Sequence, residues 1–491
     1  MKLSELLSPL AFFQAKGELD MEITGIATDS RKVKPGNLFV ALRGFTVDGH
    51  DFIQQAQEKG AAAYLVEEDM DIPQVCIRVS DTTRALAILA AQFYGHPTSS
   101  LRLLGVTGTN GKTTVTHLVE QILNDAGHST GIIGTIQMRM GDYAEEVKNT
   151  TPDALELQRM FAIMLEKGAT HACIEVSSHA LEMGRVWGCD FKTGIFTNLT
   201  QDHLDYHRTM ENYRHAKSLL FSQLGNTYNG KQQKFAVLNI DDPSTAVYRK
   251  MTAAQVITYG IDQDADVQAL NISIGSGGTA FTLQTFQGSA EIEMKMMGKF
   301  SVYNVLAATA ACLMEGVSLP QIKASIERMA GVPGRFEAVD EGQDYAVIVD
   351  YAHTPDSLEN VLATAREFTK GKLYCVVGCG GDRDKIKRPI MAQIASENAD
   401  CTIFTSDNPR SEDPQAILDD MVRELKKEAT GKYECIIDRK QAIERSIALA
   451  NSGDCIVIAG KGHETYQIIK GQVLDFDDRK VASFAIRKGM K

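Results

Sequence analysis

The stretch Gly108-Thr109-Asn110-Gly111-Lys112-Thr113-Thr114 decides the fold. It follows residues 103–106, which have the apolar character of a buried strand, and precedes residues 115–123, whose apolar side chains recur at helical spacing. Glycines between a strand and a helix let backbone N–H groups and the helix N-terminus face phosphates, while Lys112 supplies a cation and Thr113 offers a hydroxyl to Mg²⁺. The stretch therefore predicts a phosphate-binding P-loop.

This loop is a variant of the strict pattern. The pattern has a glycine five residues before Gly111, where this sequence has Val106, and the chain carries Gly105 and Gly108 instead. A P-loop indicates a nucleotide but not a reaction, because motors, GTPases and kinases all use one. Other residues must identify the chemistry.

The composition limits the classes of protein that remain. A chain of 491 residues suggests about three domains. Its 51 basic and 63 acidic residues leave a net charge of −12, which argues against a general binder of nucleic acid or of membrane surfaces. The nine cysteines form no CxxC pair, and the N-terminal apolar stretch is short and interrupted. We expect a cytoplasmic protein, without membrane insertion, that works as a monomer.

Strand-like runs alternate with helical stretches along the whole chain, which favours an α/β fold. Two glycine- and proline-containing segments, residues 95–100 and 331–334, interrupt this rhythm. We therefore expect three domains at residues 1–98, 99–333 and 334–491: the central one a P-loop parallel sheet and the last a Rossmann-like domain. The runs that we expect to be strands are residues 38–42, 61–66, 103–106, 172–176, 236–239, 346–350, 373–377, 402–404 and 455–459.

The P-loop and several further motifs resemble those of the Mur ligases, which build the peptide of bacterial cell-wall precursors. The motifs occur in order through all three blocks: Glu175-Val176-Ser177-Ser178-His179, Asn198-Leu199-Thr200-Gln201-Asp202-His203, Tyr213-Arg214-His215-Ala216-Lys217, Gly334-Arg335-Phe336-Glu337 and Asp350-Tyr351-Ala352-His353-Thr354-Pro355-Asp356. The set is similar to the family member that adds the third residue to UDP-N-acetylmuramoyl-L-alanyl-D-glutamate. The resemblance implies an ATP-dependent ligase of peptidoglycan synthesis that adds meso-diaminopimelate through an acyl phosphate and uses Mg²⁺.

The resemblance also implies how the phosphoryl-transfer residues are divided. Phosphorylation of a carboxylate brings two anions together, so cations and metal ions must neutralise charge. The ATP site is expected at Gly108, Thr109, Asn110, Gly111, Lys112, Thr113, Thr114, Asn304 and Arg335. Catalytic roles are expected for Lys112, Lys217, His203, Asp350 and His353, and metal ligation for Thr113, Glu175, His203 and Lys217. Since Arg335 and Asp350 come from the third block, the site would be shared across a cleft that closes on ATP.

Two of these roles come from the resemblance and not from spacing. His203 is an unusual Mg²⁺ ligand, and from its residue type alone it would be a structural histidine. Lys217 would ordinarily be a solvated helix lysine. The resemblance implies that CO₂ carbamylates Lys217, which converts the cation into a carboxylate-like metal ligand.

The UDP-linked substrate is expected to contact residues of the first two blocks, which the resemblance again supplies. These are Ser30, Asn149, Thr150, Thr151, Ser177 and Arg185. Hydroxyl groups and a guanidinium suit a ligand with a pyrophosphate and carboxylates. Taken alone, Asp29-Ser30-Arg31 is an ordinary polar turn.

The motif Asp407-Asn408-Pro409-Arg410 predicts the amino acid that is added. It follows a strand-like run of the third block, and ligands usually bind at the carboxyl ends of such strands. Arg410 can hold a carboxylate bidentately, and Asp407 and Asn408 can bind ammonium and other polar groups, so the motif favours diaminopimelate over lysine. The alternative for Arg410 is a surface arginine. The complete pocket that the resemblance implies is Arg383, Asp407, Asn408, Pro409, Arg410, Gly460 and Glu464.

Two other functions remain open from the sequence. A regulatory or mechanical P-loop NTPase would hydrolyse ATP without joining two molecules. A ligase that adds glutamate to folate shares the P-loop and the lysine region, but it does not account for the motifs at residues 29–31 and 407–410.

Overall fold

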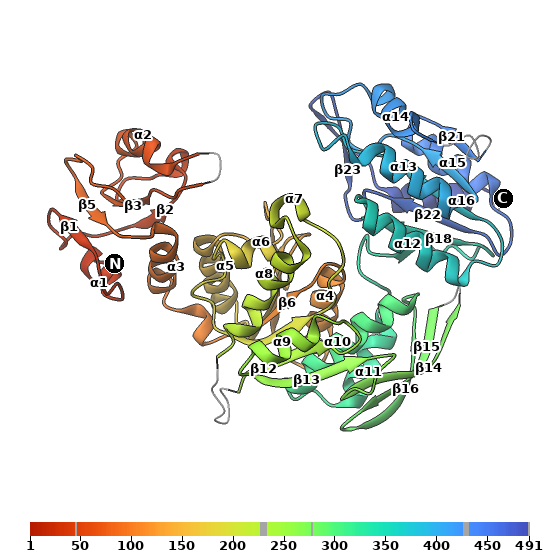
Figure 1. Cartoon of the computed structure of the whole chain (residues 1–491), viewed down its shortest axis with the longest axis horizontal. Helices are drawn as coiled ribbons and strands as arrows, with labels where there is room; N and C mark the ends of the chain where they lie inside the picture. Colours follow the sequence, from red (N-terminus) through yellow and green to blue (C-terminus); the bar gives the residue numbers. More distant parts are fainter. Residues whose placement is uncertain (45–46, 226–232, 276–277, 426–431, 490–491) are drawn as a thin grey trace.

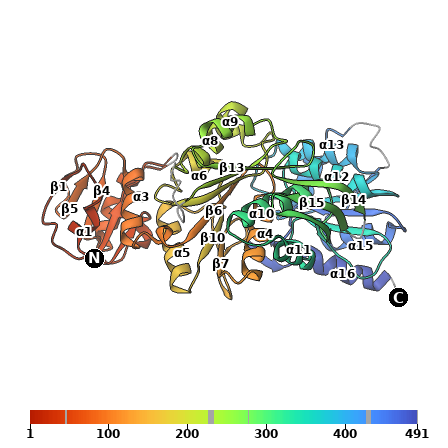
Figure 2. The ribbon, with the colours of Figure 1, turned by 90° about the horizontal axis from the view of Figure 1, so that it is seen from below.

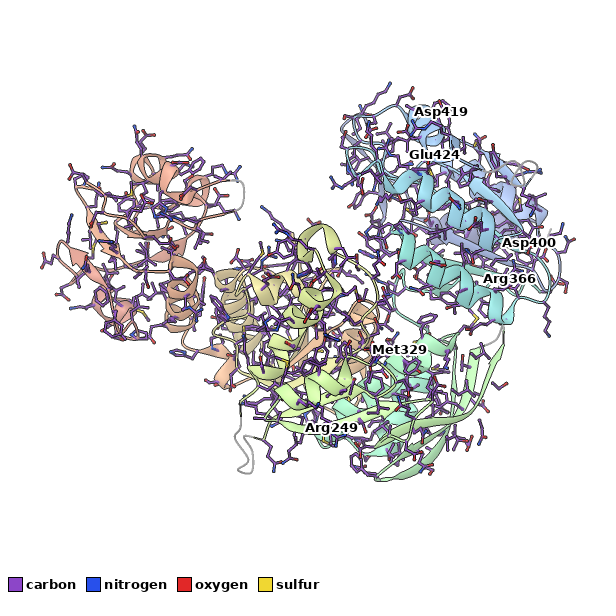
Figure 3. The ribbon with its side chains drawn as sticks, in the orientation of Figure 1. Arg249, Met329, Arg366, Asp400, Asp419 and Glu424 are labelled. Carbon is purple, nitrogen blue, oxygen red and sulfur yellow. The ribbon has the colours of Figure 1, made fainter. Side chains whose placement is uncertain are left out.

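The computed structural model describes residues 1–491 except 45–46, 226–232, 276–277, 426–431 and 490–491. Three α/β blocks follow one another along the long axis of the molecule (Figures 1 and 2). The N-terminal block lies at one end and the C-terminal block at the other, with the P-loop block between them. Met329 lies near the junction of the central and C-terminal blocks (Figure 3).

The N-terminal block is a five-stranded sheet in the order β1-β5-β4-β3-β2, parallel except for β1. Buried aliphatic side chains cover its faces, and helix α3 begins where the Asp81 carboxylate accepts a hydrogen bond from the Arg84 N–H. The elements are α1 (Leu3–Leu7), β1 (Gln14–Lys16), β2 (Gly25–Ala27), η1 (Ser30–Lys32), β3 (Asn37–Val40), η2 (Gly49–Phe52), α2 (Ile53–Glu58), β4 (Ala63–Val66), β5 (Val75–Arg78) and α3 (Thr82–Phe93).

The central block is an eleven-stranded sheet in the order β16-β15-β14-β13-β12-β11-β6-β10-β7-β8-β9. Its elements are η3 (Pro97–Ser99), β6 (Arg102–Thr107), α4 (Lys112–Asp125), β7 (Thr130–Ile133), β8 (Met138–Met140), β9 (Tyr143–Glu145), α5 (Ala154–Glu166), β10 (His171–Glu175), α6 (Ser178–Glu182), β11 (Phe191–Phe196), α7 (Leu204–His207), α8 (Met210–Ser222), β12 (Phe235–Asn239), α9 (Thr245–Met251), β13 (Gln255–Gly260), β14 (Val267–Gly275), β15 (Gly278–Thr285), β16 (Gly288–Met294), α10 (Lys299–Met314) and α11 (Leu319–Arg328).

The expectation of a parallel sheet holds only for the middle of this block. The neighbouring strands β7, β10, β6, β11, β12, β13 and β14 are parallel, whereas β8 and β9 on one edge and β15 and β16 on the other are antiparallel. Only a few residues separate each edge strand from the strand before it in the chain, and so short a connection permits only antiparallel pairing. The alternating burial along β15 leaves one face exposed, which is typical of antiparallel edges.

The C-terminal block is a six-stranded sheet in the order β17-β18-β22-β19-β20-β21, parallel except for β17, with a separate hairpin of β23 and β24. Its elements are β17 (Glu337–Ala338), β18 (Ala346–Asp350), α12 (Pro355–Phe368), β19 (Leu373–Val377), α13 (Lys387–Asn398), β20 (Cys401–Phe404), α14 (Pro414–Val422), β21 (Tyr433–Cys435), α15 (Arg439–Leu449), β22 (Cys455–Ala459), β23 (Tyr466–Ile469), β24 (Gln472–Asp475) and α16 (Asp478–Gly489).

All nine runs that the sequence predicts as strands overlap strands of the structure, and the α/β class is confirmed. The nine cysteines are free thiols. Among the described residues, no helix has the length and apolar character needed to cross a membrane.

Candidate functional site

Two glycines fix the shape of the P-loop. Gly108 has φ 150°, and a Cβ there would lie 1.8 Å from the Thr197 Oγ1 atom. Gly111, at φ 86°, caps α4, and a Cβ there would lie 2.4 Å from Asn304 Oδ1. A side chain at either position would collide with a neighbour, so both must be glycine. The same contact places the predicted ATP residue Asn304 directly against the loop.

The loop that follows β11 braces the P-loop. Asn198 Oδ1 accepts a hydrogen bond from the Asn110 N–H at 2.9 Å, and Asn198 Nδ2 donates to the Asn110 carbonyl at 3.2 Å. Lys112 Nζ donates to the carbonyls of Gly108 at 3.0 Å and Thr109 at 2.8 Å, so its ammonium lies over the loop. Burial lowers the pKa of Lys112. Sequence reasoning did not assign Asn198, although this residue begins one of the motifs.

Glu175 is buried, with 1% of its surface exposed, at the end of β10 and next to the P-loop strand. Its Oε2 accepts hydrogen bonds from the Thr113 hydroxyl at 3.0 Å and the Thr135 hydroxyl at 3.0 Å, while Oε1 accepts one from the Thr135 N–H at 2.8 Å. The predicted metal ligands Thr113 and Glu175 are therefore in direct contact. Thr114, which follows in α4, is buried.

Lys217 does not have the solvated environment of an ordinary helix lysine. Only 1% of its surface is exposed, and its Nζ donates to the Gly108 carbonyl at 2.8 Å. Burial lowers the pKa of Lys217 well below its usual range, and the Lys112 ammonium nearby lowers it further. The amine also lies 4.5 Å from the centre of the Tyr213 ring. A buried, readily neutral amine beside the P-loop has the form that reacts with CO₂.

Tyr213 connects Lys217 with His203 and the P-loop, and sequence reasoning did not single it out. Its hydroxyl shares a hydrogen bond with Thr109 Oγ1 at 3.2 Å, and its ring centre lies 6.0 Å from that of His203. The His203 side chain is 45% exposed and lies 3.3 Å from the Asp202 carboxylate. Within the described residues, no group of three His, Cys, Asp or Glu side chains is arranged to hold a metal.

The C-terminal block reaches the P-loop through two contacts. Arg335 Nη2 donates to the Thr113 hydroxyl at 3.2 Å, and Asn110 Nδ2 donates to the Asp356 carboxylate at 3.3 Å. Thr200 also donates to Asp356, at 3.4 Å. Asp356 is a further residue that sequence reasoning did not assign, although it ends a quoted motif. The structure therefore brings the second and third blocks together at the phosphate loop.

Asp350 is the last residue of β18, and His353 follows three residues later. Asp350 accepts hydrogen bonds from the N–H groups of Phe336 at 2.7 Å and Ala352 at 2.8 Å. Burial raises the pKa of Asp350, while the neighbouring Arg335 opposes the rise. The carboxylate thus orients the backbone beside Arg335. The His353 side chain is exposed and contacts the Tyr351 carbonyl through Nδ1 at 2.9 Å.

Four of the six residues predicted for the UDP-linked substrate lie together. The Thr151 hydroxyl accepts a hydrogen bond from the Ser177 N–H at 3.0 Å, and Arg185 Nη1 donates to the Thr151 carbonyl at 3.1 Å. Thr150 contacts Thr135 at 3.1 Å and so adjoins Glu175. Asn149 is exposed in the preceding loop. Ser30 lies in the N-terminal block instead, buried, where its hydroxyl donates to Gln55 at 2.6 Å.

The residues predicted to bind diaminopimelate converge after β19, β20 and β22. Arg410 Nη1 donates to the Gly381 carbonyl at 2.8 Å, and a Cβ on Gly380 would contact both Arg410 and Arg383. Pro409 is buried beside Gly381. The two arginines therefore flank one glycine loop.

Acidic and amide side chains form the other half of this cluster. Asn408 Nδ2 donates to Glu464 Oε2 at 2.9 Å, and a Cβ on Gly460 would lie 2.7 Å from Asp407 Oδ2. Lys461, which sequence reasoning did not assign, is fully buried and donates to Glu464 at 2.9 Å and to Asn408 Oδ1 at 3.2 Å. The Asn408 side chain thus holds Glu464 and Lys461, and only 2% of Asn408 is exposed.

Comparison with known proteins identifies the family. Three family models match: Mur ligase family, catalytic domain, at residues 22–94; Mur ligase middle domain, at 106–312; and Mur ligase, glutamate ligase domain, at 334–462. A protein of Bacillus cereus is 60% identical over 487 residues, covering 99% of this chain and 98% of the relative. The chain belongs to the Mur ligase family of ATP-dependent, amide-bond-forming ligases.

The names of the relatives are more specific than the family. The Bacillus cereus protein is named UDP-N-acetylmuramoyl-L-alanyl-D-glutamate--2,6-diaminopimelate ligase. A protein of Geobacillus thermodenitrificans with the same name is 54% identical over 488 residues, covering 99% of this chain and 100% of the relative. A solved structure of a ligase of that name matches with a TM-score of 0.73 and 33% identity, covering 100% of this chain and 99% of the other.

Proposed function

We propose that this protein is the ligase that joins meso-diaminopimelate to UDP-N-acetylmuramoyl-L-alanyl-D-glutamate, with ATP as the energy source, in peptidoglycan precursor synthesis. Relatives that carry this name are 60% and 54% identical to 99% of the chain. The geometric observation that carries the proposal is the cluster after β19, β20 and β22. Two arginines flank Gly380 there, and Asp407 and Glu464 lie in the adjoining loops.

This mixture of charges suits a diamino diacid. Arginine guanidinium groups pair with carboxylates through parallel N–H bonds, and carboxylates bind ammonium groups. Diaminopimelate carries a second carboxylate where lysine has only hydrogen, so a pair of arginines favours the diacid. A regulatory NTPase or a glutamate-adding ligase has no need of a site with both features.

The P-loop residues have separable roles in forming the acyl phosphate. Lys112 from the central block and Arg335 from the C-terminal block supply positive charge at the loop, and Asn304 lies against Gly111. Positive charge allows the substrate carboxylate to approach the transferred phosphoryl group. Closure of the C-terminal block over the loop would exclude water and protect the acyl phosphate until the amine attacks.

The donor atoms of the central block fit magnesium. Thr113 and Glu175 present oxygen atoms in mutual contact, and Mg²⁺ prefers oxygen ligands. A second site would use Glu175, His203 and the carbamate of Lys217, because the carbamate supplies oxygen ligands that the free amine cannot. When bound, Mg²⁺ would neutralise charge on the transferring phosphoryl group.

We also propose domains at residues 1–98, 99–333 and 334–491, with Ser30 and the cluster around Thr151 holding opposite parts of the UDP-linked substrate. Free thiols and an ATP-dependent reaction favour the cytoplasm as the compartment.

Phosphate release with each substrate omitted in turn tests the function. A ligase releases phosphate only when ATP, the UDP-linked dipeptide and the amine are all present. An NTPase releases it from ATP alone, and that result would exclude the proposal. An amine competition between diaminopimelate, lysine and ornithine, with the products weighed by mass spectrometry, tests the choice of amino acid.

A further inference from the structure

A buried ion pair lies directly beneath the amino-acid cluster of the C-terminal block. Arg439 is the first residue of α15 and Asp478 the first of α16, and these helices lie side by side in Figure 1. Arg439 Nε and Nη2 donate to the two Asp478 carboxylate oxygens at 2.8 and 2.7 Å. Both side chains are 0% exposed.

The remaining hydrogen bonds of Arg439 go to the strand ends that carry the site. Nη2 donates to the carbonyl of Ala459 at 2.9 Å, and Nη1 donates to that of Ser406 at 3.4 Å. Asp407 and Asn408 follow Ser406 in sequence, and Gly460, Lys461 and Glu464 follow Ala459. One guanidinium therefore links the two loops near the residues at which β20 and β22 end.

Close contact between these loops makes their relative position critical. A Cβ on Gly460 would lie 2.7 Å from Asp407 Oδ2, and Asn408 Nδ2 reaches Glu464 at 2.9 Å. A small displacement of either strand end would change the distance between Asp407 and Glu464. Misplacement of a binding group by about 1 Å can cost about 100-fold in activity.

The ion pairs of the two loops also favour a cationic ligand. Asp478 pairs with Arg439, and Glu464 pairs with Lys461. Among the described residues Asp407 has no ion-pair partner, so an ammonium group could pair with its carboxylate. A buried ion pair contributes little to stability compared with apolar residues of the same volume, so stability alone does not explain this pair.

We propose that Arg439 and Asp478 are positioning residues for the amino-acid substrate, which hold Asp407 and Glu464 at the separation that binds one ammonium group of diaminopimelate. This inference rests on the proposed function. The pair does not touch the substrate and acts only through the two loops.

The test compares Michaelis constants for all three substrates in the full-length chain. Arg439→Lys keeps the positive charge but loses the planar fork of the guanidinium, and Asp478→Asn keeps the size of the group but loses its charge. Both break the bidentate pair. Each is expected to raise KM for diaminopimelate about tenfold or more and to leave KM for ATP and for the UDP-linked dipeptide unchanged. Arg366→Gln is the matched control, because it breaks the exposed pair of Arg366 and Asp400 in the same block (Figure 3). It is expected to change none of the three constants.

Circular dichroism and thermal unfolding establish that each variant is folded. If folded variants have unchanged constants, or constants that rise together for all three substrates, the inference is wrong. If neither variant folds, the pair serves only the fold and the inference is also wrong. Failure of the proposed function gives a different result, because the wild-type protein would then form no product with diaminopimelate.

Discussion

The choice between diaminopimelate and lysine should depend on Arg410. Its Nη1 is held by the Gly381 carbonyl at 2.8 Å, and a guanidinium has five N–H donors, so donors remain for a carboxylate. A hydrogen bond to a charged group contributes about 1.5–3 kcal/mol. Since about 1.4 kcal/mol is a factor of ten, Arg410→Gln should lower kcat/KM for diaminopimelate by roughly 10- to 100-fold. With lysine, which lacks the second carboxylate, kcat/KM should stay nearly constant.

A competition assay measures this ratio directly. Wild type and Arg410→Gln each receive ATP, the UDP-linked dipeptide and both amines at equal concentration, and the two products are weighed by mass spectrometry. Arg410 has φ 53° and its backbone pairs with Ile468 and Lys470. Glutamine, like arginine, is unbranched at Cβ, so the replacement adds no backbone strain that arginine does not already have. Arg410→Lys is the control that keeps the charge without the planar fork. Equal losses with both amines in Arg410→Gln would refute the role of Arg410 in specificity.

Three further outcomes follow from the P-loop and its neighbours. Lys217→Ala should lower kcat about 100-fold or more, because a charged group at the transferring phosphoryl is lost. Added formate should restore part of the lost activity. Unchanged activity in Lys217→Ala would contradict the carbamate. Gly108→Ala should cost about 100-fold in kcat/KM for ATP, since the new Cβ meets Thr197 at 1.8 Å. Gly127→Ala, where φ is also positive at 92° but a Cβ meets nothing within 4 Å, should keep activity. Asp356→Ala should increase the radius of gyration in small-angle scattering, because its contacts join two blocks; an unchanged radius would show that those contacts do not hold the blocks together.

The pH dependence that comes from the uncarbamylated Lys217 amine has a definite sign. The folded pKa of Lys217 lies below the usual value of 10.5, so the folded chain binds fewer protons there than the unfolded chain. The fold is therefore destabilised as the pH falls through the folded pKa and gains stability as the pH rises towards 10.5. Lys217→Met should remove this contribution, which urea unfolding at several pH values measures.

Local patterns along the chain were sufficient to predict the α/β elements. The strands at residues 346–350, 373–377 and 455–459 coincide with β18, β19 and β22, because continuous apolar runs between helical stretches are typical of buried parallel strands. The antiparallel edges of the central sheet were not predicted. The side chains of these strands alternate in polarity. The direction in which each strand pairs depends on its neighbour in the assembled sheet, which the local sequence does not specify.

The site residues divide in the same way. Gly108, Lys112 and Thr113 could be predicted from the P-loop pattern alone, whereas Lys217 and His203 required the family resemblance. Tyr213 and Lys461 carried no signal of their own type, because a tyrosine and a lysine are common on helices and in loops. Their roles come from contacts between segments that are far apart in sequence.

Residues that hold other residues are the hardest to find from sequence. Arg439 would be interpreted as a surface arginine at the start of a helix, yet its guanidinium is fully buried and reaches the ends of two strands. Burial of a charged arginine costs free energy unless its N–H groups donate hydrogen bonds. The partners of a buried arginine must therefore be held in fixed positions. Here those bonds connect the loop of Asp407 to the loop of Glu464. The specificity of the amine site is therefore distributed between Arg410, which can contact the ligand, and a buried pair that cannot.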